Sequence, residues 1–342
     1  MEIPNALLAV VPAHEGLNYA YLNRVGLNGR HVIAMLDYQM TRIESPAYLE
    51  QLDAHLAHLK GTVYYGGCWD SYTDIQRFEA HLDSIAAYHS LSGAAVLDMG
   101  AGTGGLLLAC QGRGTSRLVG VEVNPDLHHL AELRLAGTGI ESVLTDGLDV
   151  PLPDSAFDVI LSLHVLEHTQ SPSKYLFEIA RMLKPDGVVL LACPNRLWPH
   201  ETHASLPLIT YLPISLSHRL CRWRSQSPRL PAEIRQQFHT ATLVEQYFSF
   251  FGIRRLCRKA GLEFIEVNTP LRFGAAQVIS FEAWGQAHPF VQKVADALYH
   301  RIIRDRIEPY VRAHPSSHVA HWFALLLNWE IYAVLHKRRR VY

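Results

Sequence analysis

Apolar and polar positions along residues 94 to 195 follow a pattern that switches repeatedly between strand and helix. Short apolar runs typical of buried strands are separated by stretches with apolar residues three and four positions apart. The first run ends at Asp98, and the others cover 117–123, 142–145, 157–163 and 188–193. Strands that alternate with helices favour right-handed βαβ units, which give a parallel sheet with helices on both faces. The sequence therefore predicts an α/β core.

The residues before this core have mainly helical spacing. Apolar residues recur every three or four positions at 47–59 and 72–91, so 1–92 is predicted to form a helical N-terminal cap. Between these two helices, 64–70 reads Tyr-Tyr-Gly-Gly-Cys-Trp-Asp. Two interpretations stay open for this segment: a flexible stretch that folds over a ligand, or a loop whose aromatic side chains pack on the core.

The residues after the core begin with an insertion at 196–247, which is rich in proline, histidine and arginine. A helix and a strand are predicted at 252–260 and 263–267, and 271–325 indicates a second, helical insertion. Residues 329–336 alternate again, and we expect them to form the last strand, antiparallel between its neighbours. The predicted domains are a cap at 1–92, a core at 93–270 that includes the insertion at 196–247, and a helical insertion with the final strand at 271–342.

Composition and charge narrow the class of protein. The chain has 49% hydrophobic and 18% charged residues, which is ordinary for a globular protein. Its formal net charge of −1 gives no overall field that attracts nucleic acid or an anionic membrane, so a small-molecule substrate is favoured. The five cysteines form no C-x-x-C pair, and no apolar run reaches about 20 residues. We therefore expect a cytoplasmic protein without a membrane span.

A glycine-rich stretch follows the first strand: 96–105 reads Val-Leu-Asp-Met-Gly-Ala-Gly-Thr-Gly-Gly. Glycines let backbone N–H groups approach a ligand closely, and the N-terminus of the following helix offers further donors. Gly100, Gly102 and Gly104 fit the loop of S-adenosylmethionine (AdoMet) enzymes. With Gly105 in place of Gly104, the same stretch fits the dinucleotide pattern G-x-G-x-x-G. The loop alone leaves both cofactors open.

Three acidic residues fall where predicted strands end. Asp98, Glu122 and Asp146 follow or close the first three strands, so they should meet at the carboxyl edge of the sheet, where such folds bind ligands. Glu122 lies about 20 residues beyond the loop, where a carboxylate can accept hydrogen bonds from ribose hydroxyls. Asp146 can accept from an adenine amino group. Asp98 beside the loop favours the cationic sulfonium and amino groups of AdoMet over a pyrophosphate.

Five motifs between residues 96 and 187 occur in the order in which class I AdoMet-dependent methyltransferases carry them. The chain therefore resembles this family, and in particular the branch that includes ubiquinone and menaquinone methyltransferases. The resemblance covers residues 94 to about 270. The motifs are Val-Leu-Asp-Met-Gly-Ala-Gly-Thr-Gly at 96–104, Gly-Val-Glu-Val-Asn-Pro at 120–125, Asp146-Gly147, Phe-Asp-Val-Ile-Leu-Ser-Leu-His-Val-Leu-Glu-His at 157–168 and Leu-Lys-Pro-Asp-Gly at 183–187.

This resemblance implies a Rossmann-like, seven-stranded sheet that is mostly parallel with the last strand antiparallel, and AdoMet as the cofactor. It also implies that Leu163 and His164 lie beside the methionyl part of the cofactor. The expected cofactor-binding residues are Asp98, Gly100, Ala101, Gly102, Glu122, Asp146, Gly147, Leu148, Leu163 and His164.

Histidine is the side chain best suited to act as a base near neutral pH, because its ordinary pKa lies there. His203 in the insertion is the first candidate for a catalytic base, and His168 is the second. Some ubiquinone O-methyltransferases carry a Glu-x-x-Glu-His pattern that can bind a divalent metal. Here His164 replaces its first glutamate, so no metal is expected.

Together these features predict methyl transfer to a small or medium-sized metabolite, with a hydroxyl oxygen of a phenol, quinone precursor, sugar or other natural product as the favoured acceptor. Transfer to carbon or nitrogen is an alternative on the same fold. A non-catalytic AdoMet-fold scaffold and a NAD-binding oxidoreductase are the alternatives from other classes. The arginines at 219–235 beside Trp223 do not outweigh the neutral composition, so no nucleic-acid partner is expected. Assembly into a homo-oligomer stays open.

Overall fold

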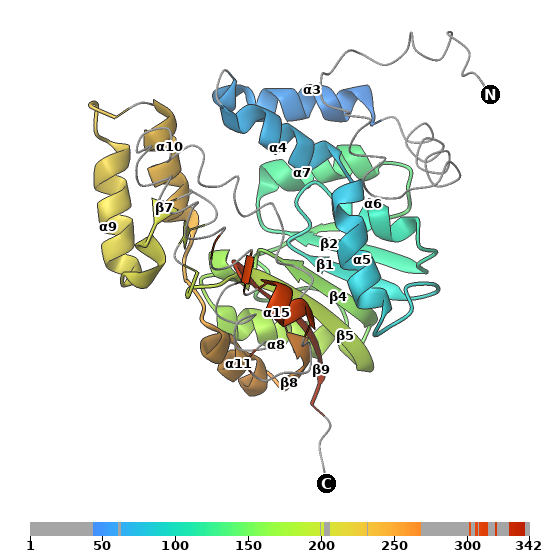
Figure 1. Cartoon of the computed structure of the whole chain (residues 1–342). Helices are drawn as coiled ribbons and strands as arrows, with labels where there is room; N and C mark the ends of the chain where they lie inside the picture. Colours follow the sequence, from blue (N-terminus) through green and yellow to red (C-terminus); the bar gives the residue numbers. More distant parts are fainter. Residues whose placement is uncertain are drawn as a thin grey trace, which may run out of the picture. The chain divides into compact units, whose positions relative to one another are not determined.

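The computed structural model describes residues 44–60, 63–198, 200–201, 206–230, 232–267 and 328–338, together with 301, 305–306, 308–313 and 319 (Figure 1). The chain divides into two compact units, Met1–Pro46 and Ala47–Tyr342. The sheet and the candidate site lie within the second unit. The part of the predicted cap before residue 44 and most of the predicted insertion at 271–325 fall outside the described residues. The domain boundaries predicted at 92 and 270 stay predictions.

A seven-stranded sheet forms the core, in the order β3-β2-β1-β4-β5-β9-β8. Strand β9 is antiparallel to both of its neighbours, and the other paired strands are parallel, which confirms the predicted fold class. The strands are β1 (Ala95–Met99), β2 (Arg117–Glu122), β3 (Glu141–Leu144), β4 (Phe157–Leu163), β5 (Leu183–Pro194), β8 (Leu262–Val267) and β9 (Glu330–Lys337).

Helices cover both faces of this sheet, as Figure 1 shows for α8 and α11 below it and α5 and α6 beside it. The described helices of at least one α-helical turn are α3 (Pro46–His55), α4 (Val63–Thr73), α5 (Glu79–Ala86), α6 (Gly105–Gln111), α7 (Pro125–Leu135), α8 (Pro172–Met182), α9 (Ile214–Ser225), α10 (Ala232–Thr240), α11 (Phe250–Lys259) and α15 (Glu308–Ala313). Shorter 3₁₀ turns are η2 (Ala57–Leu59), η3 (Gln76–Phe78), η4 (Leu166–His168), η5 (Ile209–Tyr211) and η6 (Ala241–Leu243).

Alternation along the strands separates two apolar layers. In β9, Ile331, Ala333 and Leu335 face the layer that contains α8 and α11. Tyr332 and Val334 face the layer that contains α5, α6 and α7. A strand covered on both faces buries all of its side chains, and β9 is buried from Glu330 to Leu335. The alternating pattern at 329–336 therefore correctly predicted a strand of the sheet. Both faces of this strand are covered by apolar layers, whereas an alternating pattern is typical of a strand with one face in solvent.

Residues 64–70 are not a loop or a flexible segment, because they lie within helix α4. Tyr65 stacks on Trp69 with ring centroids 6.0 Å apart, and its hydroxyl donates to Asp53 Oδ1 of α3 at 2.6 Å. The aromatic packing proposed for this segment is thus confirmed, with α3 and α7 as the packing surface. These contacts offset the low helix propensity of Gly66 and Gly67.

Two further boundaries differ from the sequence prediction. The helix predicted at 72–91 is broken, since the Asp74 carboxylate accepts the Gln76 N–H at 2.9 Å and turns the chain into η3 before α5 begins. Strand β5 starts at Leu183, five positions before the predicted start, because Leu183 pairs with Phe157 at the beginning of β4. The insertion after β5 folds into the two-stranded pair β6 (His200–Glu201) and β7 (Leu206–Pro207), followed by α9 and α10.

The central position of β9 gives a first prediction. Leu335 is fully buried, so Leu335→Ala should lower the free energy of unfolding by about 2–5 kcal/mol through lost apolar burial and the cavity left behind. Ile265 on the neighbouring β8 is 46% exposed, and Ile265→Ala should change stability by no more than about 0.5 kcal/mol. Urea denaturation followed by circular dichroism measures both values. Equal, small effects would show that β9 is not part of the folded core.

Candidate active site

A cavity of about 310 Å³ lies at the carboxyl ends of β1 and β4. Five of the predicted cofactor-binding residues line it: Asp98, Gly100, Ala101, Gly102 and Leu163. The wall also includes residues that sequence reasoning missed, namely Cys68, Ser71 and Tyr72 of α4, Arg77 and Phe78 of η3, Thr103, Gly105 and Leu106 of the glycine loop and α6, and Arg134 of α7. Of these, only Cys68 lies in a segment, 64–70, for which the sequence left contact with a ligand open, and its position on the wall agrees with that interpretation although the segment is helical. The helical spacing before the core carried no signal for the others.

The glycine loop turns sharply between β1 and α6. Gly100 has a φ of +93°, and a Cβ atom there would lie 2.3 Å from Cγ2 of Val165. Only glycine fits this position, for both backbone and packing reasons. Gly102 has a φ of +54° and nothing within 4 Å of the place a Cβ would take. The space beside its Cα is therefore open, whereas its N–H is taken by Glu122 Oε2 at 2.8 Å, and binding of a ligand by this glycine stays a prediction.

Glu122 at the end of β2 fastens this loop. Its Oε2 accepts the Gly102 N–H at 2.8 Å, and its Oε1 accepts the N–H groups of Val123 (2.9 Å) and Asn124 (2.8 Å). A carboxylate oxygen has two lone-pair positions, so these bonds fill Oε1 and leave one position on Oε2. Glu122 does not line the cavity of the described chain, so its contact with ribose hydroxyls stays a prediction.

Asp98 is buried in β1 at the cavity wall, with 3% of the residue exposed. Within the part of the chain that the structure describes, no group donates a hydrogen bond to its carboxylate. Burial raises the pKa of Asp98 to about 7, and the nearby Glu122 charge adds to the rise. An unsatisfied carboxylate in a cavity favours a cationic ligand group, because such a group would stabilise its charged form.

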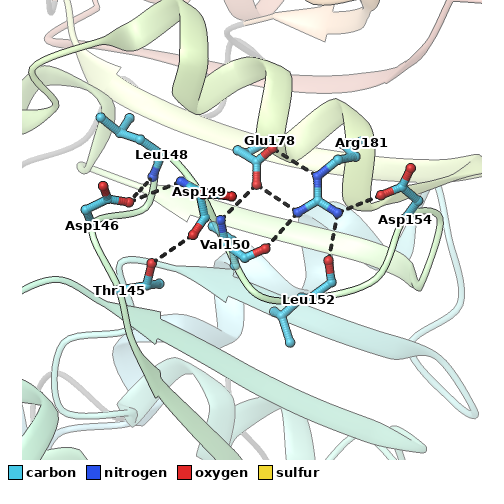
Figure 2. Close-up of polar contacts among 9 residues, drawn as sticks. All are labelled: Thr145, Asp146, Leu148, Asp149, Val150, Leu152, Asp154, Glu178 and Arg181. Atoms are coloured by element: carbon cyan, nitrogen blue, oxygen red, sulfur yellow. Dashed lines mark hydrogen bonds and ion pairs between the residues drawn. The ribbon is translucent and has the colours of Figure 1, made fainter.

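Asp146 lies at the start of the loop after β3, where it is exposed to solvent (Figure 2). Its Oδ1 accepts the N–H groups of Leu148 at 2.8 Å and Asp149 at 3.1 Å, and these two bonds lower the pKa of the carboxyl group. Gly147 between them has a φ of +71°. The acid therefore shapes its own turn, and neither Asp146, Gly147 nor Leu148 lines the cavity of the described chain.

Arg181 of α8 braces the same loop from the other side (Figure 2). Its guanidinium donates to the carbonyl oxygens of Val150 (2.9 Å) and Leu152 (2.7 Å) and pairs with Glu178 and Asp154, both at 2.7 Å. Glu178 in turn accepts the Val150 N–H at 2.9 Å. These bonds fix the position of a segment that has no regular secondary structure, and no short sequence motif predicted them.

His164 follows β4 and is held between two buried carboxylates. Its Nε2 lies 3.1 Å from Glu330 Oε2, its Nδ1 lies 3.5 Å from Glu167 Oε1, and its ring stacks on Trp329 at 5.1 Å. Burial opposes protonation, but the hydrogen bonds to Glu167 and Glu330 outweigh it and raise the pKa of His164 to about 9. At neutral pH both ring nitrogens donate, so neither has a lone pair for a metal or for a substrate proton. His164 does not line the cavity.

The two candidate bases are placed differently. His168 Nδ1 lies 2.9 Å from the Leu243 carbonyl oxygen, and His168 is absent from the cavity wall of the described chain. His203 lies outside the described residues.

The described part of the insertion is joined to the core where the Glu167 carbonyl accepts the N–H groups of Glu245 (2.8 Å) and Gln246 (3.1 Å). Among the described residues, no helix has the length and apolar character needed to cross a membrane.

The pKa of His164 gives a second prediction. Because the folded-state pKa of about 9 exceeds the ordinary 6.5, the protonated ring stabilises the fold fully below pH 6.5, and this contribution is lost as pH rises through 9. The melting temperature of the unsubstituted protein should therefore exceed that of His164→Gln most at pH 6 and least near pH 9.5. His58→Gln, at an exposed histidine on η2, should show no such pH trend. A constant difference across this range would contradict the imidazolium assignment.

Comparison with known proteins places this fold in a family. A family model described as a methyltransferase domain matches residues 73–267, which is more than half of the chain. Ajmaline N-methyltransferase of Rauvolfia serpentina is 32% identical over 100 residues, covering 28% of this chain and 34% of that protein. Ubiquinone biosynthesis O-methyltransferase of Xylella fastidiosa is 32% identical over 143 residues, covering 39% and 56%.

The chain thus spans between one third and just over one half of the length of these curated relatives. Among solved structures, an S-adenosylmethionine dependent methyltransferase from Mesorhizobium loti aligns over 75% of this chain and 98% of its own, with 14% identity and a TM-score of 0.46. With the matched domain extending from the end of α4 to the end of β8, the chain belongs to the class I AdoMet-dependent methyltransferase family.

Proposed function

We propose that this protein transfers a methyl group from AdoMet to an oxygen atom of a small or medium-sized metabolite. The observation that carries the cofactor part is Asp98, a buried carboxylate without a donor from the described chain, at the wall of the cavity beside the glycine loop. A pyrophosphate would meet this charge unfavourably, whereas an ammonium or sulfonium would be attracted. When bound, AdoMet supplies an electrophilic methyl group on its sulfonium, so a well-placed nucleophile suffices for transfer.

The residues around the cavity fit such a cofactor. The backbone of Gly100, Ala101 and Gly102 borders the space, and Leu163 contributes an apolar side chain. The remaining acceptor position on Glu122 Oε2 would take a ribose hydroxyl, and Asp146 with Gly147 and Leu148 would recognise the adenine. His164 would act only indirectly, because it pairs with the Glu167 and Glu330 carboxylates and does not line the cavity of the described chain.

The acceptor part of the proposal is supported by the class of relatives and by the chemistry of histidine. One relative is named for O-methylation in ubiquinone biosynthesis and another for N-methylation of ajmaline, and both names denote metabolites. A hydroxyl loses its proton on methylation, so a base accelerates the reaction. His164 is already protonated near neutral pH and cannot act in this way. His203 stays the first proposed base, because the insertion that carries it follows β5 at the carboxyl edge of the sheet, and His168 stays the second.

The cofactor part predicts a pH-dependent affinity. AdoMet binding should favour ionised Asp98, so its affinity should fall as pH decreases from 8 to 6 through the pKa of about 7. The change should approach tenfold per pH unit below that pKa. In Asp98→Asn the affinity should be weaker and nearly independent of pH. Isothermal titration calorimetry measures both profiles, and parallel profiles for the two proteins would refute a direct role of Asp98.

The transfer itself is tested with methyl-labelled AdoMet and a panel of phenols, sugars and amines, with mass spectrometry of the products. We expect label on a hydroxyl oxygen, together with release of S-adenosylhomocysteine. His203→Ala should lower turnover at least about 100-fold with unchanged AdoMet affinity, as expected for loss of a general base. His168→Ala is the matched variant and should retain most of the turnover.

Other outcomes separate the alternatives. Label on nitrogen or carbon would replace the oxygen assignment while leaving the cofactor assignment intact. Tight AdoMet binding without transfer to any acceptor, including those in a cell extract, would favour a non-catalytic scaffold. Binding of NADH in place of AdoMet would identify an oxidoreductase and overturn the proposal.

A further inference from the structure

Trp329 and His164 form a stacked pair of rings at the carboxyl edge of the sheet. Their ring centroids lie 5.1 Å apart, and the two rings are within 3° of parallel. His164 directly follows Leu163 of the cavity wall, and Trp329 directly precedes β9. Because β9 is antiparallel to β5, its first residues lie at the edge where β4 and β5 end. The proposed function needs a methyl acceptor at this edge, and the inference rests on that function.

The imidazole ring of this pair is held rigidly. Its Nε2 lies 3.1 Å from Glu330 Oε2 and its Nδ1 lies 3.5 Å from Glu167 Oε1, so both ring nitrogens are engaged. The backbone of His164 has a φ of +56°, which is uncommon for a residue other than glycine. Such strain persists where the surroundings hold it, and it is concentrated at functional sites. His164 therefore gives one face of the indole a fixed support.

The indole of Trp329 keeps binding capacity beyond this stack. The residue is half-buried, and within the described part of the chain its ring stacks on no ring other than that of His164. Among the same residues, its indole N–H donates no hydrogen bond. A tryptophan combines a large apolar face with one polar donor, and both are commonly used in binding. The second face of the indole therefore suits a flat ring.

Polar side chains around the stacked pair are already engaged with the protein. Asn195 accepts the Leu197 N–H at 3.0 Å and donates to the Asn328 carbonyl at 2.9 Å. His168 Nδ1 lies 2.9 Å from the Leu243 carbonyl oxygen, and the two buried carboxylates already bind the imidazole. A sugar needs partners for several hydroxyl groups, whereas an aromatic ring needs mainly a flat apolar surface. These surroundings therefore favour an aromatic ligand over a sugar.

We propose that Trp329 binds the methyl acceptor by stacking, and that this acceptor is a planar aromatic compound with a hydroxyl group. The ring of the acceptor lies on the face of the indole opposite His164. Of the acceptors that the sequence left open, this arrangement favours phenols and quinone precursors over sugars. Trp329 is then an acceptor-binding residue that selects for flat rings.

The test compares two ligands with the same carbon skeleton and the same hydroxyl group. 2-Naphthol is planar and aromatic, whereas decahydro-2-naphthol is its saturated, puckered counterpart. Titration calorimetry in the presence of saturating S-adenosylhomocysteine measures both affinities, and the unsubstituted protein should bind 2-naphthol more tightly. Trp329→Leu should weaken binding of 2-naphthol by about 3- to 10-fold, the loss expected for one stacked aromatic pair. Binding of decahydro-2-naphthol should stay nearly unchanged.

Three further variants serve as controls. Trp329→Phe keeps an aromatic ring and should retain most of the preference for 2-naphthol. Trp329→Met removes the ring but keeps a large apolar side chain, so it should lose the preference as Trp329→Leu does. Phe177→Leu removes an exposed aromatic residue of α8 outside the cavity wall, and it should leave both affinities unchanged. Each variant should bind S-adenosylhomocysteine as the unsubstituted protein does, which shows that the fold is intact.

The outcomes separate this inference from the proposed function. An equal loss for both ligands, no loss in Trp329→Leu and Trp329→Met, or no preference of the unsubstituted protein for 2-naphthol would overturn the stacking role of Trp329. Transfer of labelled methyl groups to sugars but not to phenols would overturn the acceptor class and leave the proposed function intact. Failure of the unsubstituted protein to bind S-adenosylhomocysteine would overturn the proposed function instead.

Discussion

The hydrogen bonds made by the Glu122 carboxylate are the constraint on which the rest of the site depends. The loop after β1 has little side-chain volume of its own, so its shape is set by bonds to the end of β2. The Val121 carbonyl accepts the N–H groups of Gly100 (2.8 Å) and Ala101 (2.9 Å). The Glu122 carboxylate accepts the N–H groups of Gly102, Val123 and Asn124. The next residue, Asn124, caps the helix that carries Arg134. One strand end thereby positions both walls of the cavity.

Most of the buried charged side chains of the described chain are carboxylates. The buried aspartate, glutamate, lysine and arginine residues of the described chain are Asp98, Glu122, Glu167, Glu330 and Arg134. His164 adds one positive charge between two of the carboxylates. Burying several carboxylates is costly unless each meets a donor or a cation. The excess of negative charge thus creates an environment in which a cationic ligand is stabilised and an anionic one is disfavoured.

The sequence predicted the sheet well because its signals are local. Runs of apolar residues identify strands, and glycines with a following helix identify a ligand loop, without knowledge of distant contacts. The position of the acids at one edge followed from the parallel arrangement alone. Helix α4 was missed because its stability depends on Tyr65 meeting Asp53 of another helix. The pair of His164 and Glu330 could not be predicted, since 166 positions separate the two residues.

The contacts of side chains with loops could not be predicted from the sequence either. The side chain of Arg181 selects two carbonyl oxygens of an irregular segment, and carbonyl groups have no sequence signature. Arg77 had only the pattern of a helical surface residue, which many solvated arginines share. In both cases the place of the side chain depends on how the turns between helices and strands are closed. Those turns are fixed by individual hydrogen bonds and not by the periodicity of the flanking elements.

The antiparallel insertion of β9 also has a consequence for the order of folding. Strands β5 and β8 both pair with β9 and not with each other, so the sheet has a gap until residues 330–337 have been synthesised. The pairing between β5 and β9 joins segments more than 130 positions apart, which makes it a slow, non-local step. Glu330 on that strand brings the second carboxylate to His164. A nascent chain can therefore form the glycine loop early, but the polar cluster next to it is assembled only when the sheet closes.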